Sequence, residues 1–316
     1  MSRRQGVTWA ATSVPEIRRQ WCTALDRTVE HFSEALAPIE PSIGAGSRRL
    51  QRTQAKLATE MEIMKAETRA VRGAELYWVA RDMVNIALDA ASTLPEWTPA
   101  LVLPAPTGLL CWAKPAATVP YGPASISTAD VPWDAVFWWS RPDGMLQLAP
   151  SSRFVKQPEL IAPYQVVTPL WAANTIVINP REPRTEEANG AEDSHPFVSV
   201  VGAAWLLMSQ PGVAETRTIA NTGSGSRAAS GAPKPDVAPI PQVTLVDLRR
   251  PARPPHEAPG GTSDRGFNRR WWVGGHWRQQ ACGPNHSERR PKWIAPYIKG
   301  PQDKPLVNDR VNVWRR

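Results

Sequence analysis

The sequence has few cysteines and no long apolar stretch. Cys22, Cys111 and Cys282 are its three cysteines, and they lie too far apart to form a disulfide framework. This excludes a small disulfide-stapled secreted domain. The longest apolar stretch, residues 197–208, is far shorter than the roughly 20 residues of a membrane-spanning helix. Residues 1–14 lack the apolar region of a signal peptide. We therefore expect an intracellular protein.

Carboxylates are scarce near the C-terminus. Residues 266–316 hold eleven Lys and Arg side chains against Glu288, Asp303 and Asp309, so this segment carries the +8 formal charge of the whole chain. The same segment is rich in tryptophan. Clustered cations attract phosphate backbones, and aromatic rings stack on unpaired bases. The sequence therefore indicates nucleic acid as the ligand, with RNA or single strands preferred over duplex DNA.

Helical patterns occupy the first part of the chain. Ser13 and Glu16 form a capping box around Pro15, which predicts a helix over about residues 14–37. Apolar residues then recur every seven positions from Leu50 to Trp78 and predict a second helix over about residues 47–92. The alternate heptad positions are polar, which favours packing on the same domain, with a two-stranded coiled coil as the alternative.

The pattern changes to that of strands after residue 104. Short β-branched and aromatic runs separated by Pro and Gly predict strands within about residues 108–178. Residues 141–144 read Arg-Pro-Asp-Gly, a turn that joins two antiparallel strands. Trp138 and Trp139 should point to opposite faces, so at most one is expected in the core. Residues 197–210 are apolar all round and predict a buried helix.

The predicted fold class is α+β, with N-terminal helices packed on an antiparallel sheet and a small basic β module at the C-terminus. Pro/Gly-rich linkers that cannot repay the entropy of ordering join the two, so we expect removal of the module to leave the core folded. The expected divisions are a flexible N-terminus at 1–13, the core at 14–220, a linker at 221–241, a strand at 242–250, a second linker at 251–264 and the module at 265–316.

The candidate nucleic-acid-binding side chains are the cationic and aromatic residues of the module. Cations neutralise phosphates and rings stack on bases. The Gly274–Gly275 pair leaves the backbone open to a phosphate immediately before His276. The candidates are Arg269, Arg270, Trp271, Trp272, Trp277, Arg278, Arg289, Arg290, Lys292, Trp293, Tyr297 and Lys299.

A second hypothesis is catalytic. His276, Arg278 and His286 could act as proton carriers and phosphate ligands of a metal-independent endoribonuclease, as in a toxin-like effector. His276, Cys282 and His286 match no common zinc-site spacing and lack a fourth ligand, so no metal and no cofactor is expected. A third hypothesis is an assembly or host-interaction protein whose basic module meets an acidic protein partner.

The run from Arg269 to Gln280, followed by the run from Arg289 to Pro301, resembles the C-terminal signature of proteins encoded by actinobacterial phages and mobile elements. Residues 202–208, 213–218 and 243–250 are also similar to that family. The chain departs from the signature at Gly274, where the family usually has arginine. The resemblance implies a phage or mobile-element accessory protein acting in the cytoplasm of a bacterial host, and it implies no particular activity.

Overall fold

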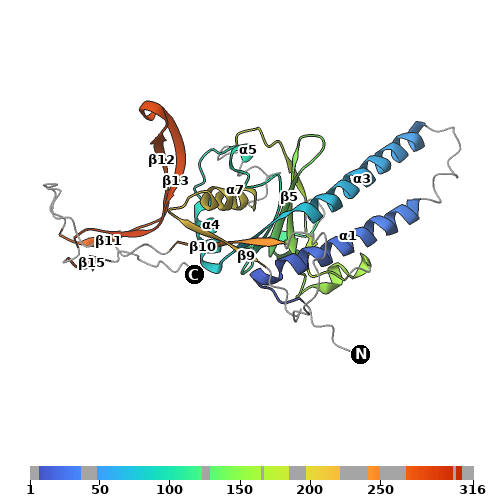
Figure 1. The fold of residues 1–316 in the computed structure, drawn as a ribbon, viewed down its shortest axis with the longest axis horizontal. Helices are drawn as coiled ribbons and strands as arrows, with labels where there is room; N and C mark the ends of the chain where they lie inside the picture. Colours follow the sequence, from blue (N-terminus) through green and yellow to red (C-terminus); the bar gives the residue numbers. More distant parts are fainter. Residues whose placement is uncertain are drawn as a thin grey trace, which may run out of the picture.

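The structure, a computed structural model, describes residues 7–36, 48–122, 129–164, 167–184, 197–220, 241–249, 268–301 and 304–307. It confirms the α+β class. Long N-terminal helices pack on a large mixed sheet, and small C-terminal strands extend from this body (Figure 1).

Two long helices form the N-terminal part. The helix α1 (Val14–Leu36) begins directly after the short 3-10 turn η1 (Ala11–Ser13), and α3 (Arg48–Gly73) runs beside it. Their distal ends reach beyond the sheet in Figure 1. Glu16 in the first turn of α1 accepts hydrogen bonds from Arg19 and Gln20, and Arg72 of α3 pairs with Asp26 of α1. The predicted helix start near residue 14 agrees with these bounds.

The predicted helix over residues 47–92 is wrong in its middle. After α3 the chain forms a strand, β1 (Glu75–Val79), and then a separate helix, α4 (Arg81–Ala91). Residues 76–79 are all buried, because β1 has a neighbouring strand on each edge and helices over both faces. A strand buried on both faces is a continuous apolar run. The seven-residue spacing therefore follows α3 as far as Val71, and only its last member, Trp78, lies in a strand.

The main sheet has the strand order β7-β6-β5-β2-β1-β10-β9, and β8 also pairs with β6. Strand β1 is parallel to both β2 and β10, and the other pairs are antiparallel. The sheet is thus mixed. The strands are β2 (Thr107–Trp112), β5 (Ala135–Ser140), β6 (Leu146–Ser152), β7 (Trp171–Ala172), β8 (Ile176–Ile178), β9 (Ala214–Ala220) and β10 (Gln242–Leu248).

The turn predicted at residues 141–144 joins β5 to β6. The backbone N–H of Gly144 donates to the carbonyl of Arg141 at 3.0 Å, and Gly144 has a φ of 80°, which favours glycine. Several shorter elements lie outside the main sheet. These are α5 (Pro99–Val102), β3 (Thr118–Pro120) paired with β4 (Asp130–Pro132), and the 3-10 turns η2 (Pro158–Leu160) and η3 (Ala162–Tyr164).

Helices cover both faces of the sheet, and this corrects the expectation for Trp138 and Trp139. The helices α4 and α7 (Phe197–Met208) pack on one face, and α1 and α3 pack on the other. Trp138 is buried in the first cluster and Trp139 in the second. Neighbouring side chains on a strand do point to opposite faces, but each face here belongs to a core. As predicted, α7 is buried along almost its whole length.

The C-terminal residues form two small sheets. One has the order β14-β11-β15, and the other is a hairpin of β12 and β13. The predicted linkers fall almost entirely outside the described residues, so the domain divisions stay predictions. The elements are β11 (Arg270–Val273), β12 (His276–Cys282), the 3-10 turn η4 (Pro284–His286), β13 (Glu288–Ile294), β14 (Tyr297–Lys299) and β15 (Leu306–Val307).

Candidate nucleic-acid interface

Two tryptophans fix the β12–β13 hairpin to the core. Trp293 is 2% exposed and belongs to the cluster formed with α4 and α7. Its ring meets the ring of Trp277 edge-on, with 5.3 Å between centroids. The indole N–H of Trp277 donates to the carbonyl oxygen of Ala90 at 2.9 Å, and the backbone N–H of Trp293 donates to Oε1 of Gln210 at 2.9 Å. The base of the hairpin is therefore held at the ends of α4 and α7.

This anchoring changes the role of two candidate residues. The sequence predicts that Trp277 and Trp293 stack on bases. Trp293 instead packs in the core and leaves no ring face for a base, and the half-buried Trp277 uses its N–H on Ala90. The expectation that linkers decouple the module from the core is wrong for the hairpin, because the hairpin contributes a side chain to that core.

The glycine pair before β12 serves this packing. A Cβ added at Gly275 would lie 2.4 Å from the ring of Trp293, whereas a Cβ at Gly274 would meet nothing within 4 Å. Real Cβ atoms do not approach other atoms this closely, so Gly275 is needed to let the backbone pass over the indole. The sequence predicted that a phosphate approaches the backbone at Gly275, but in the structure the ring of Trp293 occupies that position.

Strand alternation gives the hairpin a docked face and an outer face. Trp277 and Trp293 are cross-strand partners on the docked face. The neighbouring pairs place the other set of side chains on the opposite side, with Arg278 opposite Lys292. We call this set the outer face. Gln280, Cys282 and Ile294 on this face are half-buried and the other members are exposed. The members are His276, Arg278, Gln280, Cys282, Glu288, Arg290, Lys292 and Ile294.

The outer face carries the cations Arg278, Arg290 and Lys292 against one carboxylate, that of Glu288. Arg278 and Lys292 are directly opposite each other, an arrangement that destabilises an antiparallel pair. Among the residues that the structure describes, neither has a carboxylate partner. Arg290 has one, with its Nη2 3.4 Å from Oε2 of the exposed Glu288. The hairpin thus concentrates cations at a cost in stability, as an anion-binding surface does.

A second surface carries rings and a cation together. In the sheet of β11 and β14, Trp271 pairs with Lys299 and Val273 pairs with Tyr297, so the four side chains share a face. The ammonium of Lys299 lies 5.9 Å from the ring centroid of Trp271, and Tyr297 is 42% exposed. Unlike Trp293, Trp271 and Tyr297 therefore keep part of their ring surface accessible.

The remaining candidates are spread over both small sheets. Arg269 and Arg289 are exposed, and Arg289 lies on the docked side of the hairpin, opposite Ala281. Arg270 donates from Nε to the carbonyl of Lys304 at 2.8 Å, which ties β11 to the segment before β15. Trp272 lies in β11, in register with Ile298.

The proposed catalytic histidines do not come together. His276 begins β12 at the base of the hairpin, and His286 lies in the turn at its tip. A strand rises by about 3.3 Å per residue, so the two rings are on the order of 20 Å apart. A proton-transfer pair must reach the same phosphodiester. His276, Arg278 and His286 therefore cannot act as one ribonuclease site in this arrangement.

The same separation applies to the metal hypothesis. His276 and Cys282 stand at opposite ends of β12, and Sγ of Cys282 lies 4.0 Å from Oε2 of Glu288. Over the described parts of the chain, no three His, Cys, Asp or Glu residues are grouped so that they could hold a metal ion.

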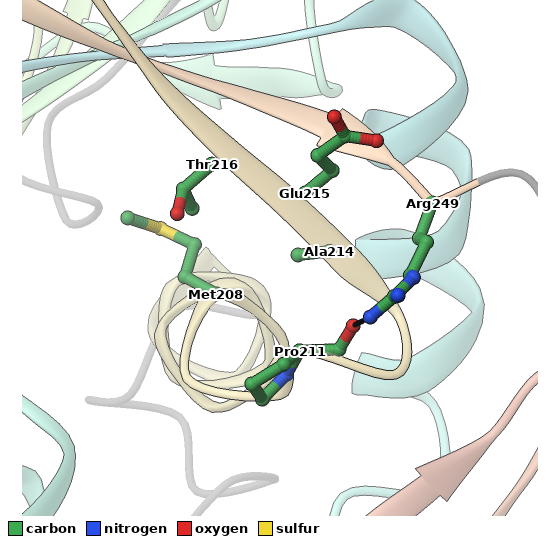
Figure 2. Close-up of a pocket in the computed structure, with 6 residues that line it drawn as sticks. All are labelled: Met208, Pro211, Ala214, Glu215, Thr216 and Arg249. Atoms are coloured by element: carbon green, nitrogen blue, oxygen red, sulfur yellow. Dashed lines mark hydrogen bonds between the residues drawn. The ribbon is translucent and has the colours of Figure 1, made fainter.

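A cavity that no sequence pattern predicted lies at the edge of the sheet. It has a volume of about 380 Å³ and lies between the end of α7 and β9 (Figure 2). Nη1 of Arg249 donates to the carbonyl of Pro211 at 2.5 Å across its rim, and Glu215 and Thr216 also line it. A neighbouring cavity of about 400 Å³ shares Met208 and Thr216. Five of the six residues that line the first cavity lie within residues 208–216, and Arg249 comes from the residue after β10.

A comparison with protein-family models matches residues 80–300 to one described as AcrVA2-like, the anti-CRISPR type V subtype A2 family. The match includes most of the main sheet, α4, α7 and the β12–β13 hairpin. No curated protein and no solved structure matches the chain. Within the described residues, no helix combines the length and apolar character needed to cross a membrane.

Proposed function

The chain belongs to the AcrVA2-like anti-CRISPR type V subtype A2 family, and from this membership we propose that it is a phage or mobile-element accessory protein that acts against a type V CRISPR system. We further propose that it binds nucleic acid through the β12–β13 hairpin. On this proposal it acts in the cytoplasm of the bacterial host, where its target is made.

The observation that carries the nucleic-acid proposal is the cross-strand pair of Arg278 and Lys292. Two exposed like charges are held opposite each other on a ribbon that Trp277 and Trp293 fix in place. A polyanion resolves this repulsion when it binds, because each cation then faces phosphates and releases their counterions. Arg290 on the same face adds a third cation.

The face formed by Trp271, Tyr297 and Lys299 supports the same proposal. It offers aromatic surface and a cation near the hairpin in the chain. Stacking of a base on an exposed ring contributes about 1–3 kcal/mol and tolerates any sequence. Unpaired nucleotides adjoining the main contact could be held here, while the outer face supplies the electrostatic attraction.

The test is a salt titration of binding by the full chain. Purified protein is mixed with labelled DNA and RNA at several salt concentrations, and the affinity is compared with that of the double variant Arg278→Ala, Lys292→Ala. Loss of two phosphate contacts should reduce the slope of log affinity against log salt by about 1.8 on duplex or about 1.4 on single strands.

The control is Lys156→Ala, which removes an exposed cation from the loop after β6 and should leave the slope unchanged. Failure of the wild-type chain to retain any nucleic acid at low salt would refute the proposal. Salt-dependent binding to an acidic protein in its place would support the alternative of a protein-contact surface.

A further inference from the structure

We propose that the outer face of the β12–β13 hairpin binds in the major groove of duplex DNA. This inference rests on the proposed function, since it names the form of nucleic acid that the hairpin takes. It reverses the preference for RNA or single strands that the composition of the C-terminal segment suggests. The reason is that the rings of Trp277 and Trp293 lie on the docked face of the hairpin.

The first argument is the burial of the hairpin's aromatic side chains. Proteins that bind single strands stack successive bases on exposed aromatic rings. Both tryptophans of the hairpin lie on the docked face, where Trp293 is in the core and Trp277 bonds to Ala90. The outer face has no aromatic ring apart from the imidazole of His276. It is therefore equipped for groove contacts and poorly equipped for stacking.

The second argument is shape. The hairpin is a two-stranded antiparallel ribbon whose strands pair only with each other among the described strands. In Figure 1 it stands away from the main sheet, with its tip farthest from the body. The major groove of B-form DNA, about 12 Å wide, admits a two-stranded ribbon. The major groove of A-form RNA is too deep and narrow for side chains to read.

The third argument is the chemistry of the exposed side chains. Arg278, Arg290 and Lys292 share the outer face with Gln280, and Gln280 is the cross-strand partner of Arg290. Arginine and lysine pair with the O6 and N7 acceptors of guanine, and glutamine pairs with N6 and N7 of adenine. Because the core holds the opposite face, these four side chains can point to the floor of a groove. Glu288 at the tip end of the same face pairs with Arg290 in the free protein.

The experiment uses the full-length chain and a short mixed-sequence probe in three forms: duplex DNA, single-stranded DNA and single-stranded RNA. We expect the duplex to bind at least about tenfold more tightly than either single strand, as direct base contacts would require. Dimethyl sulfate footprinting of the bound duplex then reports the groove, because guanine N7 lies in the major groove and adenine N3 in the minor groove. We expect protection at guanine N7.

Two adjacent arginines provide the matched variants. Arg290→Ala removes a cation from the outer face and should weaken duplex binding about tenfold or more and relieve N7 protection. Arg289→Ala removes an exposed cation from the other side of the same strand and should leave the protection pattern unchanged. Equal or tighter binding of a single strand, or protection confined to adenine N3, would overturn the inference and leave nucleic-acid binding intact. Failure to bind any of the three probes would overturn the proposed function itself.

Discussion

At the scale of residues, a side-chain methyl group added at Gly275 would collide with Trp293, whereas one added at Gly274 would meet no other atom. We expect Gly275→Ala to lower the free energy of unfolding by about 1–3 kcal/mol, because the new Cβ forces the ring of Trp293 out of its place. Gly274→Ala, where the space is open, should change it little. Urea unfolding monitored by tryptophan fluorescence measures both. Equal effects of the two substitutions would contradict the packing role of Gly275.

A second residue-scale prediction concerns Glu67 on α3. Burial raises the pKa of its carboxyl group above the ordinary value, although a hydrogen bond from Gln147 and the charge of Arg141 act in the opposite direction. A group whose folded-state pKa is raised stabilises the fold below its unfolded pKa and loses that contribution as pH rises through the folded pKa. Glu67→Gln should therefore raise Tm relative to wild type at pH 7.

The check on this prediction is thermal unfolding at pH 4 and pH 7. The advantage of Glu67→Gln should shrink at the lower pH, where the wild-type carboxyl group is largely protonated. Glu62→Gln is the control, because the pKa of that exposed carboxyl group is lowered by a hydrogen bond from Lys65. It should give no gain at pH 7. A Glu67→Gln advantage that is the same at both pH values would exclude the assignment.

At the scale of elements, the sequence predicted the features that depend on local residues, such as a helix start and a turn. It did not predict that strand β1 is buried on both faces. The capping box at Ser13 located the start of α1, and the turn at residues 141–144 joined two strands. Strand β1 was predicted as helix because Trp78 continues the seven-residue spacing of α3, and a short apolar stretch does not by itself distinguish a doubly covered strand from a buried helix. Helices α3 and α4 flank it in the sequence, but α1, α7 and the paired strand β10 come from distant segments, which a local pattern cannot show.

In the candidate site too, the features set by local sequence were predictable and those set by contacts with distant residues were not. The sequence identified a cationic and aromatic segment, and alternation predicted that His276 and Arg278 share a face. It could not tell which face meets the core, because the groups that receive Trp277 and Trp293 are a carbonyl oxygen at Ala90 and the side chain of Gln210. Neither group has a sequence signature. The separation of the two histidines also required the strand bounds.

A substitution in the hairpin separates its stability from its function. Lys292→Glu places a carboxylate opposite Arg278, so repulsion becomes attraction and the hairpin gains about 0.2–1 kcal/mol. The same change should weaken nucleic-acid binding about tenfold or more, since one cation is lost and an anion faces the phosphates. Hydrogen exchange of the hairpin amides and binding assays measure the two effects. A variant that is more protected and binds as well as wild type would rule out this use of the outer face.

At the scale of the whole molecule, the C-terminal elements contribute to the stability of the core. Removal of residues 268–316 deletes Trp293 and uncovers the surfaces of α4 and α7 that it packs against. Loss of a buried tryptophan alone costs about 3–5 kcal/mol. We expect the truncated chain to unfold at a clearly lower denaturant concentration than the full chain. An unchanged midpoint would restore the picture of an independent module.

Strands that are neighbours in the main sheet lie far apart in the sequence, so the sheet can be completed only after its later strands have been synthesised. Strand β1, made early, lies beside β10, which is made much later, and the core receives Trp293 later still. A chain leaves the ribosome N-terminus first, and pairings between such distant segments form slowly. A partly synthesised chain therefore cannot close its sheet or position its cationic hairpin. On the proposed function, nucleic-acid binding would therefore begin only after β13 has been made, and a chain that stops before β10 would lack both the complete sheet and the binding surface.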